Sequence, residues 1–231
     1  MASENRDRRE TMKTFGNKLD EILADKQLEV EKLLPLSDKL QFSAQAREEF
    51  RSFETALGGA LREQDGDEGY GKSPLSVIAE VKKGSPSAGI IEVQIYEAVV
   101  AGADAILLIV GALEQEELVH LLDVAHSYQL DVLVEVHDLE EMERALETDA
   151  KIIGVNNRNL KTIEVALHTP ETLSEEVGPY QILVSESGIY TGADTEINQS
   201  WRADAILVGE ALMRSKNRPA KMAELKGLPV A

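Results

Sequence analysis

Six short apolar runs recur along the chain after residue 74, and they alternate with segments whose apolar residues recur at helical spacing. The helical segments include residues 115–128 and 139–146. The apolar runs are LSVIAEV (75–81), DAILLIV (104–110), DVLVEV (131–136), KIIGVN (151–156), QILVSES (181–187) and DAILVGE (204–210). Continuously apolar runs rich in β-branched residues are typical of strands buried on both faces of a parallel sheet. The pattern therefore predicts an α/β fold of six βα units.

The first 74 residues follow a different pattern. Apolar residues between Leu19 and Leu33 recur at helical spacing among many charges, which predicts an amphipathic helix. This helix should end near Leu34-Pro35, because the residue before a proline is disfavoured in the α conformation. A second helix is predicted over residues 43–61, and an acidic, glycine-rich loop over residues 63–71.

Length and charge narrow the class of protein. The chain has 231 residues, of which 43% are hydrophobic and 29% charged, as in ordinary globular domains. We expect a single domain in which residues 1–74 form a helical N-terminal extension and residues 75–231 form the βα units. The 24 basic and 42 acidic residues give a net charge of −18, which argues against binding to nucleic acid or to an anionic membrane. A small basic site for a phosphorylated metabolite remains compatible with this charge.

The residue types also exclude several kinds of site and location. There are no cysteines, which excludes disulfides, cysteine–zinc sites and thiol catalysis. The first ten residues are polar and lack the apolar core of a signal peptide. The longest apolar stretch, residues 105–113, is far shorter than the roughly 20 residues of a membrane helix. These features predict a soluble, cytoplasmic protein.

Polar side chains stand two residues apart at the ends of four predicted strands. The pairs are Glu80 and Lys82, Glu135 and His137, Asn156 and Arg158, and Ser185 and Ser187. Side chains two apart on a strand share a face, and parallel α/β folds carry their sites at the carboxyl ends of the strands. A single pair is most simply a strand end that turns to solvent, but a charge inside an apolar run is costly unless it is paired. Four such pairs favour a convergent site.

Two further features are compatible with an anion site. Glycines follow the last two strands, in Ser187-Gly188 and Gly209-Glu210, where barrels commonly hold a phosphate on backbone N–H groups; tight βα turns explain them equally well. The loop at residues 82–89 is basic and rich in hydroxyl groups, which suits a carboxylate or phosphate, although lysines after a strand are usually solvated. Metal-ligand clusters, P-loops, and GxGxxG and GxSxG motifs are absent from the sequence.

Six segments, in this order, resemble the indole-3-glycerol phosphate synthase family, the TIM-type (β/α)8 barrels of tryptophan biosynthesis. They are IAEVKKGSPSAGII (78–91), GADAILLIV (102–110), DVLVEVHD (131–138), IIGVNNRNLKT (152–162), LVSESGI (183–189) and LVGEALMR (207–214). The helical N-terminal extension also resembles that of the family. The alternative interpretation is another phosphate-binding barrel, such as a relative of phosphoribosylanthranilate isomerase. This interpretation does not account for the Glu80/Lys82 and Asn156/Arg158 pairs together.

The resemblance implies a lyase without cofactor or metal that acts on a phosphorylated small molecule, with no nucleic-acid or membrane partner. It would decarboxylate and dehydrate 1-(2-carboxyphenylamino)-1-deoxyribulose 5-phosphate to indole-3-glycerol phosphate. By this resemblance Glu135 would be the general base, and Glu80 and Lys82 would serve in proton transfer and in binding the substrate carboxylate. Asn156 would orient the substrate. The other implied contacts are Ser85, Arg158, Glu186 and Ser187 for the substrate, and Gly188, Gly209 and Glu210 for its phosphate.

One part of the family pattern has no counterpart in this chain. The family carries a second strand, its helix and a third strand after the first-strand loop, and a lysine at the end of that third strand is its usual general acid. Here Ile91 is followed directly by Glu92, and residues 92–97 resemble the helix that comes next. Three alternatives stay open: a synthase with slowed catalysis, a non-catalytic remnant that retains phosphate-ligand or partner binding, and a full barrel whose gene was read with a segment missing.

The missing segment also leaves two alternatives for the sheet. The first strand and the strand at 104–110 either pair directly in a tightened six-stranded barrel, or leave a gap with unpaired edges. Open edges invite pairing with another chain, so we expect a monomer or a weak oligomer.

Overall fold

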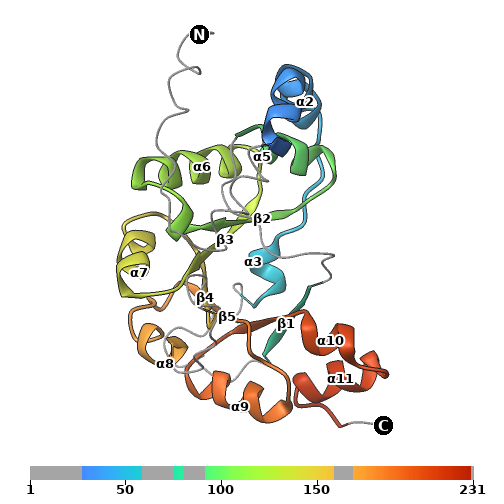
Figure 1. Ribbon diagram of the computed structural model, residues 1–231, viewed down its shortest axis with the longest axis vertical. Coiled ribbons are helices and arrows are strands. Elements are labelled where there is room, and N and C mark those ends of the chain that lie inside the picture. Colours follow the sequence, from blue (N-terminus) through green and yellow to red (C-terminus); the bar gives the residue numbers. More distant parts are fainter. Residues whose placement is uncertain (1–27, 59–74, 81–91, 159–168, 230–231) are drawn as a thin grey trace.

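Six parallel strands form a single sheet in the computed structural model, which describes residues 28–58, 75–80, 92–158 and 169–229 (Figure 1). The strands are β1 Ser76–Ala79, β2 Ala105–Ile109, β3 Asp131–Val136, β4 Ile152–Asn156, β5 Ile182–Glu186 and β6 Ala205–Val208. Each lies inside its predicted apolar run, so the predicted six-stranded α/β fold is confirmed.

The sheet is an open, curled half-barrel with the strand order β1-β6-β5-β4-β3-β2. Among the described residues, β1 pairs only with β6 and β2 only with β3, and every pairing is parallel. The strands β1 and β2 therefore form the two edges, at opposite ends of the row. Of the two alternatives for six strands, the structure has the one with a gap.

Helices that follow the strands in the chain cover the outer, convex face of the sheet (Figure 1). They are α5 Glu92–Val100, α6 Gln115–Ser127, α7 Leu139–Leu146, α8 Thr169–Leu173, α9 Gly192–Ser200, α10 Glu210–Arg214 and α11 Arg218–Leu225. The two helices predicted from spacing correspond to α6 and α7. Helix α6 begins with a capping box in which Glu117 accepts the backbone N–H of Glu114 at 3.0 Å, so its acidic start stabilises the helix.

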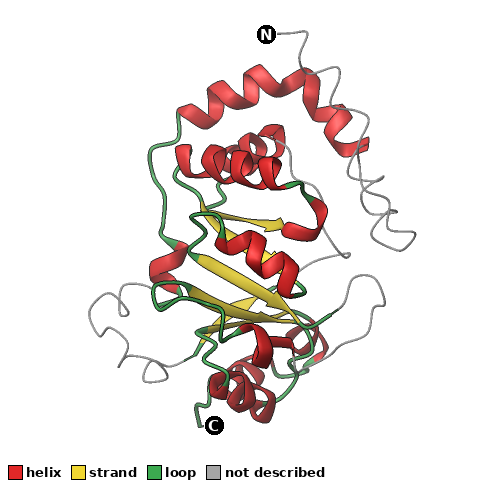
Figure 2. Cartoon of the chain, turned by 90° about the vertical axis from the view of Figure 1, so that its left-hand side faces the viewer, coloured by secondary structure: helices red, strands yellow, loops and turns green. Residues whose placement is uncertain are grey.

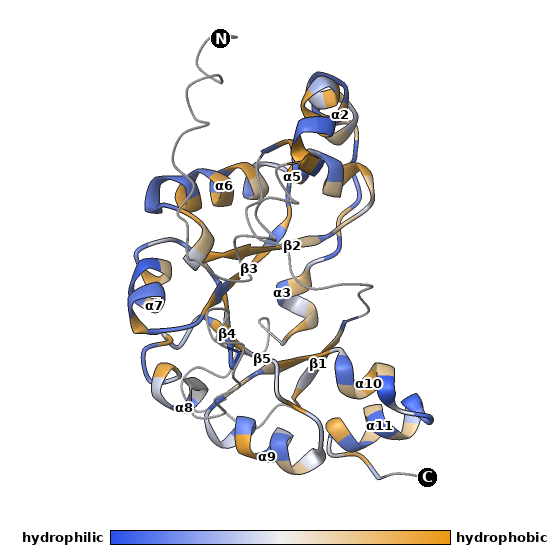
Figure 3. Cartoon of the chain, in the orientation of Figure 1, coloured by the Kyte–Doolittle hydropathy of each residue, from blue (hydrophilic) through white to orange (hydrophobic). Residues whose placement is uncertain are grey.

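Alternate residues of the strands pack into two separate cores, one on each face of the sheet. The outer core lies between the strands and the helices and includes Val134, Ile153 and Leu183. The inner core takes residues from all six strands, with Leu133 and Ile152 among them. In Figure 3 the strands are hydrophobic and the helices are mixed, as expected for strands that are buried on both faces.

The N-terminal extension differs from its prediction. The α-helix ends at Leu33 as Pro35 predicts, but the chain then continues through a 3₁₀ turn (η2, Leu34–Leu36) into α2, Ser37–Gln45. The predicted helix over 43–61 is wrong, because α2 ends at Gln45 and only the short helix α3, Phe53–Ala56, follows within the described residues. The spacing of apolar residues does not predict this break, because the conformation of residues 46–58 depends on contacts with strands that are distant in the chain.

The extension closes the amino end of the sheet. Arg47 and Arg51 form ion pairs with Asp104, just before β2, at 2.5 and 2.6 Å. The Asp131 carboxylate, at the start of β3, accepts the backbone N–H groups of Phe53 and Glu54 at 2.6 and 2.9 Å. Phe53 and its neighbour Leu57 then pack into the inner core. Figure 2 shows the strands running side by side in one direction.

Replacing Asp131 by alanine should lower the free energy of unfolding by about 1–2 kcal/mol, because the first N–H groups of α3 would lose their carboxylate partner. Urea unfolding of the whole chain measures this change. Asp149→Ala is the matched control: Asp149 is exposed and lies 3.5 Å from His126, so its removal should change stability by less than about 0.5 kcal/mol. Equal effects of the two substitutions would contradict the docking role of Asp131.

Candidate active site

A polar layer lies on the inner face of the sheet at the carboxyl ends of β3, β4 and β5. In the strand register, Glu135 lies opposite Gly154, and Asn156 lies opposite Glu186. These residues share the inner face with Leu133 and the rest of the inner core, because side chains two apart on a strand point the same way. The structure thus brings together three of the predicted site residues: Glu135, Asn156 and Glu186.

Glu135 is buried among polar partners. Its Oε1 accepts a hydrogen bond from Nδ2 of Asn156 at 3.1 Å and lies 3.2 Å from Nε2 of His137. The other imidazole nitrogen, Nδ1, lies 2.9 Å from Oε2 of Glu141. The His137 ring is therefore held between two carboxylates.

Helix α7 brings Glu141 to this position. Asp138 caps the helix by accepting the backbone N–H of Glu141 at 2.9 Å. Glu141 in turn accepts a hydrogen bond from the backbone N–H of His137 at 2.8 Å. This pair of hydrogen bonds resembles a capping box, except that Glu141 binds the residue before the N-cap and not the N-cap itself. Its Oε1 lies over Gly111, where an added Cβ would approach to 2.5 Å. A glycine at this position therefore leaves space for the carboxylate.

Glu135 and His137 each stabilise the charged form of the other. Burial lowers the pKa of His137, but contact with Glu135 and Glu141 outweighs burial and raises it to about 9. Burial raises the pKa of Glu135, whereas His137, Asn156 and Glu186 together hold it below its usual value. At neutral pH the site therefore contains an imidazolium beside an ionised Glu135.

The side chain of Glu186 extends from β5 over the neighbouring strand β4. It is 3% exposed, and its Oε1 lies 2.1 Å from the position that a Cβ on Gly154 would occupy. Its carboxyl therefore lies over β4, the strand between Glu135 on β3 and Glu186 on β5. Only a residue without a side chain at position 154 leaves space for this approach.

Ser185 and Ser187 do not behave as a pair on the inner face. Ser185 is fully buried next to Glu186 in sequence and so points to the other face, where its Oγ accepts a hydrogen bond from Asn157 at 3.2 Å. The carbonyl of Ser187 accepts a second hydrogen bond from Asn157 at 2.9 Å. Ser187 and Gly188 have positive φ angles, 65° and 74°, so a tight turn follows β5.

A second group of polar residues surrounds Glu210, at the start of α10. Its carboxylate accepts a hydrogen bond from Tyr190 at 2.8 Å and lies 2.7 Å from Arg214 and 4.0 Å from Arg158. The hydrogen bond from Tyr190, with burial, raises the pKa of that phenol. The backbone N–H of Arg158 donates to Asn156 at 3.0 Å, which connects this group to the first one.

Glu80 lies on the other side of the half-barrel, beside β6. Its Oε2 is 3.0 Å from the position of a Cβ on Gly209, and its backbone N–H donates to Val208 at 2.9 Å. The predicted Glu80 and Gly209 are therefore neighbours. Lys82 and Ser85, with the rest of the loop at 82–89, lie outside the described residues.

Sequence spacing left three contributors out of the predicted site: Glu141, Gly154 and Tyr190. Gly154 had a readable signal, because a glycine inside a strand often marks a close approach of another group. Glu141 follows Asp138 at capping-box spacing, which predicts a helix start without showing that the carboxylate turns toward His137. Tyr190 had no signal in the sequence that distinguishes it from a surface tyrosine.

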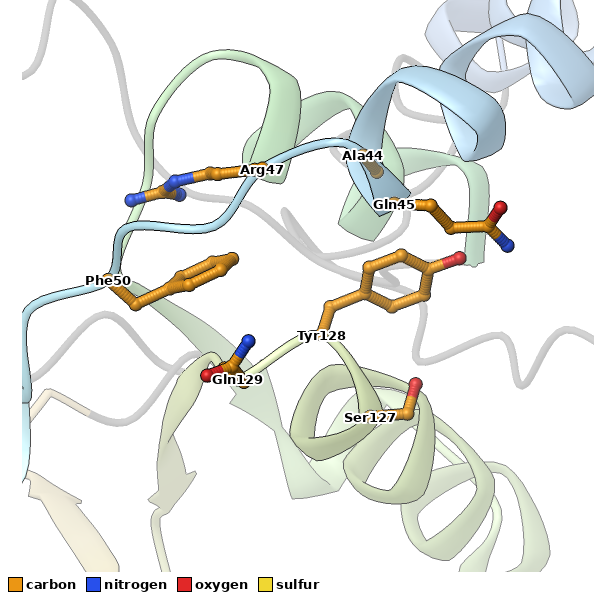
Figure 4. A pocket seen from close by; sticks show the side chains of 7 residues that line it. All are labelled: Ala44, Gln45, Arg47, Phe50, Ser127, Tyr128 and Gln129. Carbon is orange, nitrogen blue, oxygen red and sulfur yellow. The ribbon is translucent and has the colours of Figure 1, made fainter.

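A shallow pocket of about 280 Å³ lies at the opposite end of the molecule, between the extension and the end of α6 (Figure 4). It is lined by Ala44, Gln45, Arg47, Phe50, Ser127, Tyr128 and Gln129. The guanidinium of Arg47 stacks 4.0 Å above the ring of Phe50. This pocket belongs to the amino ends of the strands and is separate from the polar layer.

The described residues lack two further features. In them, no three or more His, Asp or Glu side chains cluster in a way that suits a metal ion. Each helix in the same ranges is too short or too polar to cross a lipid bilayer.

A curled sheet of parallel strands with a buried acid–base group at its carboxyl ends defines a protein of the βα-barrel class. Within that class, the family model of indole-3-glycerol phosphate synthase matches residues 90–225, more than half of the chain. The chain therefore belongs to the indole-3-glycerol phosphate synthase family, as the resemblance of its motifs predicted.

Individual relatives agree with this family. The chain is 49% identical over 132 residues to indole-3-glycerol phosphate synthase of Polynucleobacter asymbioticus, which covers 57% of the chain and 49% of that relative. It is 46% identical over 138 residues to the enzyme of the same name of Lachnospira eligens, covering 58% and 52%. The chain thus spans about half the length of the curated relatives it matches. A solved thiamine phosphate pyrophosphorylase from Pyrococcus furiosus is similar with a TM-score of 0.47 at 16% identity, over 85% of this chain and 90% of that one.

Proposed function

We propose that this chain catalyses the indole-3-glycerol phosphate synthase reaction, in which 1-(2-carboxyphenylamino)-1-deoxyribulose 5-phosphate closes its ring and loses carbon dioxide and water. The observation that carries the proposal is the buried Glu135 at the carboxyl end of β3, kept ionised by His137 and hydrogen-bonded to Asn156. Because Glu135 is ionised at neutral pH and lies at the carboxyl end of its strand, it can accept a proton in the reaction.

The remaining predicted residues receive their roles within this proposal. Arg158 binds the substrate. Glu210 orients the Arg158 guanidinium, and contacts with Tyr190 and Arg214 fix the Glu210 carboxylate. Gly188 and Gly209 offer backbone N–H groups to the phosphate, because a glycine has no side chain that would keep the phosphate away from the backbone. Residues 1–74 and 75–231 act as one domain, which the contacts of Arg47 and Asp131 with both parts support.

A steady-state assay of the purified chain tests the proposal. We expect product to form, at a rate about 10²–10⁴-fold below that of full-length relatives, because no residue of this chain matches the general-acid lysine of the family. Absence of turnover, with substrate or a product analogue still bound in calorimetry, would instead support the non-catalytic remnant that retains ligand binding. Turnover equal to that of the relatives would show that the missing segment is not needed.

The gene sequence across the codons for Ile91 and Glu92 settles the third alternative. A strand, helix and strand encoded there would show that the full protein is a complete barrel. An uninterrupted junction would show that no strand is missing between residues 91 and 92.

A further inference from the structure

Three charged side chains lie in a row at the carboxyl end of β3: Glu141, His137 and Glu135. Nδ1 of the imidazole lies 2.9 Å from Oε2 of Glu141, and Nε2 lies 3.2 Å from Oε1 of Glu135. The side chains of Glu141, His137 and Glu135 are 12%, 10% and 7% exposed, so little water can stabilise their charges. Each charge in the row therefore depends on its neighbour.

The oxygens on both sides of the ring act as hydrogen-bond acceptors. Oε2 of Glu141 accepts the backbone N–H of His137 at 2.8 Å, and Oε1 of Glu135 accepts a hydrogen bond from Asn156 at 3.1 Å. A ring nitrogen that faces an acceptor carries a hydrogen, and an imidazole with hydrogens on both nitrogens is the cation. The arrangement therefore favours an imidazolium between the two carboxylates.

The loop after β2 fixes the position of the Glu141 carboxylate. Its Oε1 lies 2.5 Å from the position that a Cβ on Gly111 would occupy. Arg144, on the same helix as Glu141, donates to the backbone carbonyls of Val110 and Leu113 at 3.2 and 2.6 Å. These two hydrogen bonds attach the loop around Gly111 to α7, so the carboxylate is held between the loop and the ring.

The other charged groups near the row have partners of their own. On α7, Asp138 accepts the backbone N–H of Glu141 at 2.9 Å, and Arg144 donates to the loop after β2. From β5, Glu186 extends over β4. Among the described side chains, two carboxylates lie within ion-pair distance of the ring, Glu135 from β3 and Glu141 from α7.

We propose that Glu141 is a positioning residue of this site, which holds the His137 ring with its Nε2–H toward Glu135. The inference rests on the proposed function, in which Glu135 accepts a proton. Glu141 acts through the ring, because it contacts Nδ1 whereas Glu135 lies at Nε2. The charged ring in turn holds the Glu135 carboxylate ionised and in place for the substrate.

The Glu141→Gln variant of the whole chain removes the charge and keeps the shape. An amide oxygen in place of Oε2 can still accept the hydrogen bonds from the backbone and ring of His137. The pKa of His137 should fall from about 9 to about 8 or lower, because an opposite charge is lost. NMR of the ring nitrogens as a function of pH measures this change, with His137→Gln to assign the signal. Glu140→Gln, at an exposed carboxylate on the same helix, is the matched control and should leave this pKa unchanged.

The dependence of kcat/KM on pH provides a second readout, which a merely structural residue would not move. When the ring loses its proton, Nδ1 keeps the hydrogen that faces Glu141, so a bare Nε2 faces Oε1 of Glu135 and repels it. Activity should therefore fall as the pH rises through the pKa of His137. In Glu141→Gln this alkaline limb should move from about pH 9 to about pH 8 or lower.

Gly111→Ala tests the geometry without removing the carboxylate. An added methyl group would meet Oε1 of Glu141 and displace the carboxylate from the ring, so the pKa of His137 should fall as it does in Glu141→Gln. Gly178→Ala is the matched control, because a Cβ there meets one side-chain oxygen at 3.4 Å, and the pKa should remain at the wild-type value. Circular dichroism shows whether each variant is folded.

Two results would overturn the proposal: a ring of His137 that titrates in folded Glu141→Gln as it does in the wild type, or an alkaline limb that stays in place in that variant. Failure of the proposed function looks different. In that case the wild-type chain forms no product, whereas the lower pKa of His137 in Glu141→Gln and in Gly111→Ala still shows that Glu141 holds the charged ring.

Discussion

Replacing Glu135 by glutamine is expected to lower the turnover of 1-(2-carboxyphenylamino)-1-deoxyribulose 5-phosphate by about 10²–10⁴-fold. Glutamine keeps the size of the side chain and an oxygen that can accept the hydrogen bond from Asn156. It removes the negative charge that faces His137 and with it the ability to accept a proton. A loss in kcat with a nearly unchanged KM would assign Glu135 to the chemical step.

The matched control for this substitution is Glu143→Gln. Glu143 is an exposed carboxylate on α7, and its substitution also removes one negative charge from the chain. Its turnover should equal that of the wild type. Equal losses in the two variants would mean that net charge, and not the position of Glu135, controls the rate.

The second large effect concerns stability as a function of pH. His137 keeps its proton in the folded protein to about pH 9, whereas in the unfolded chain it loses the proton near its ordinary pKa of 6.5. A group whose folded pKa is raised stabilises the protein below the unfolded pKa, and this contribution is lost as the pH rises through the folded value. The free energy of unfolding should therefore fall by roughly 3 kcal/mol between pH 6.5 and pH 9.

Urea unfolding at a series of pH values measures this change. In a His137→Gln variant the fall over the same pH range should be nearly absent, because no group there binds the proton between Glu135 and Glu141. His126→Gln is the control: His126 lies on the surface at 3.5 Å from Asp149, so the slope should persist. A wild-type stability that stays constant from pH 6.5 to pH 9 would contradict a charged His137.

The strands could be predicted from the sequence because the signal is local. A run such as AILLIV (105–110) is apolar on both faces, which a buried parallel strand requires and a surface helix does not tolerate. The positions of Glu135 and Asn156 at the ends of such runs also follow from the alternation of side chains along a strand. For these residues the sequence pattern was sufficient to predict a shared polar layer.

The extension could not be predicted in the same way. Residues 46–58 have helical spacing, but Asp104 and Asp131 bind Arg47 and the start of α3, and these partners are more than 50 residues away in the chain. The same reason applies to Glu141 and Gly154. Their importance depends on what lies against them across the sheet, which no spacing rule contains.

The sequence by itself determined the class of fold, the number of strands, the family and the side of the sheet that carries the polar residues. These properties depend on periodic burial and on short motifs, which the order of residues contains directly. Only the tertiary structure decided that the sheet stays open between β1 and β2 and that the Glu186 carboxyl lies over Gly154. The reason is physical: strand pairing, close side-chain approach and pKa depend on distances between residues far apart in the chain.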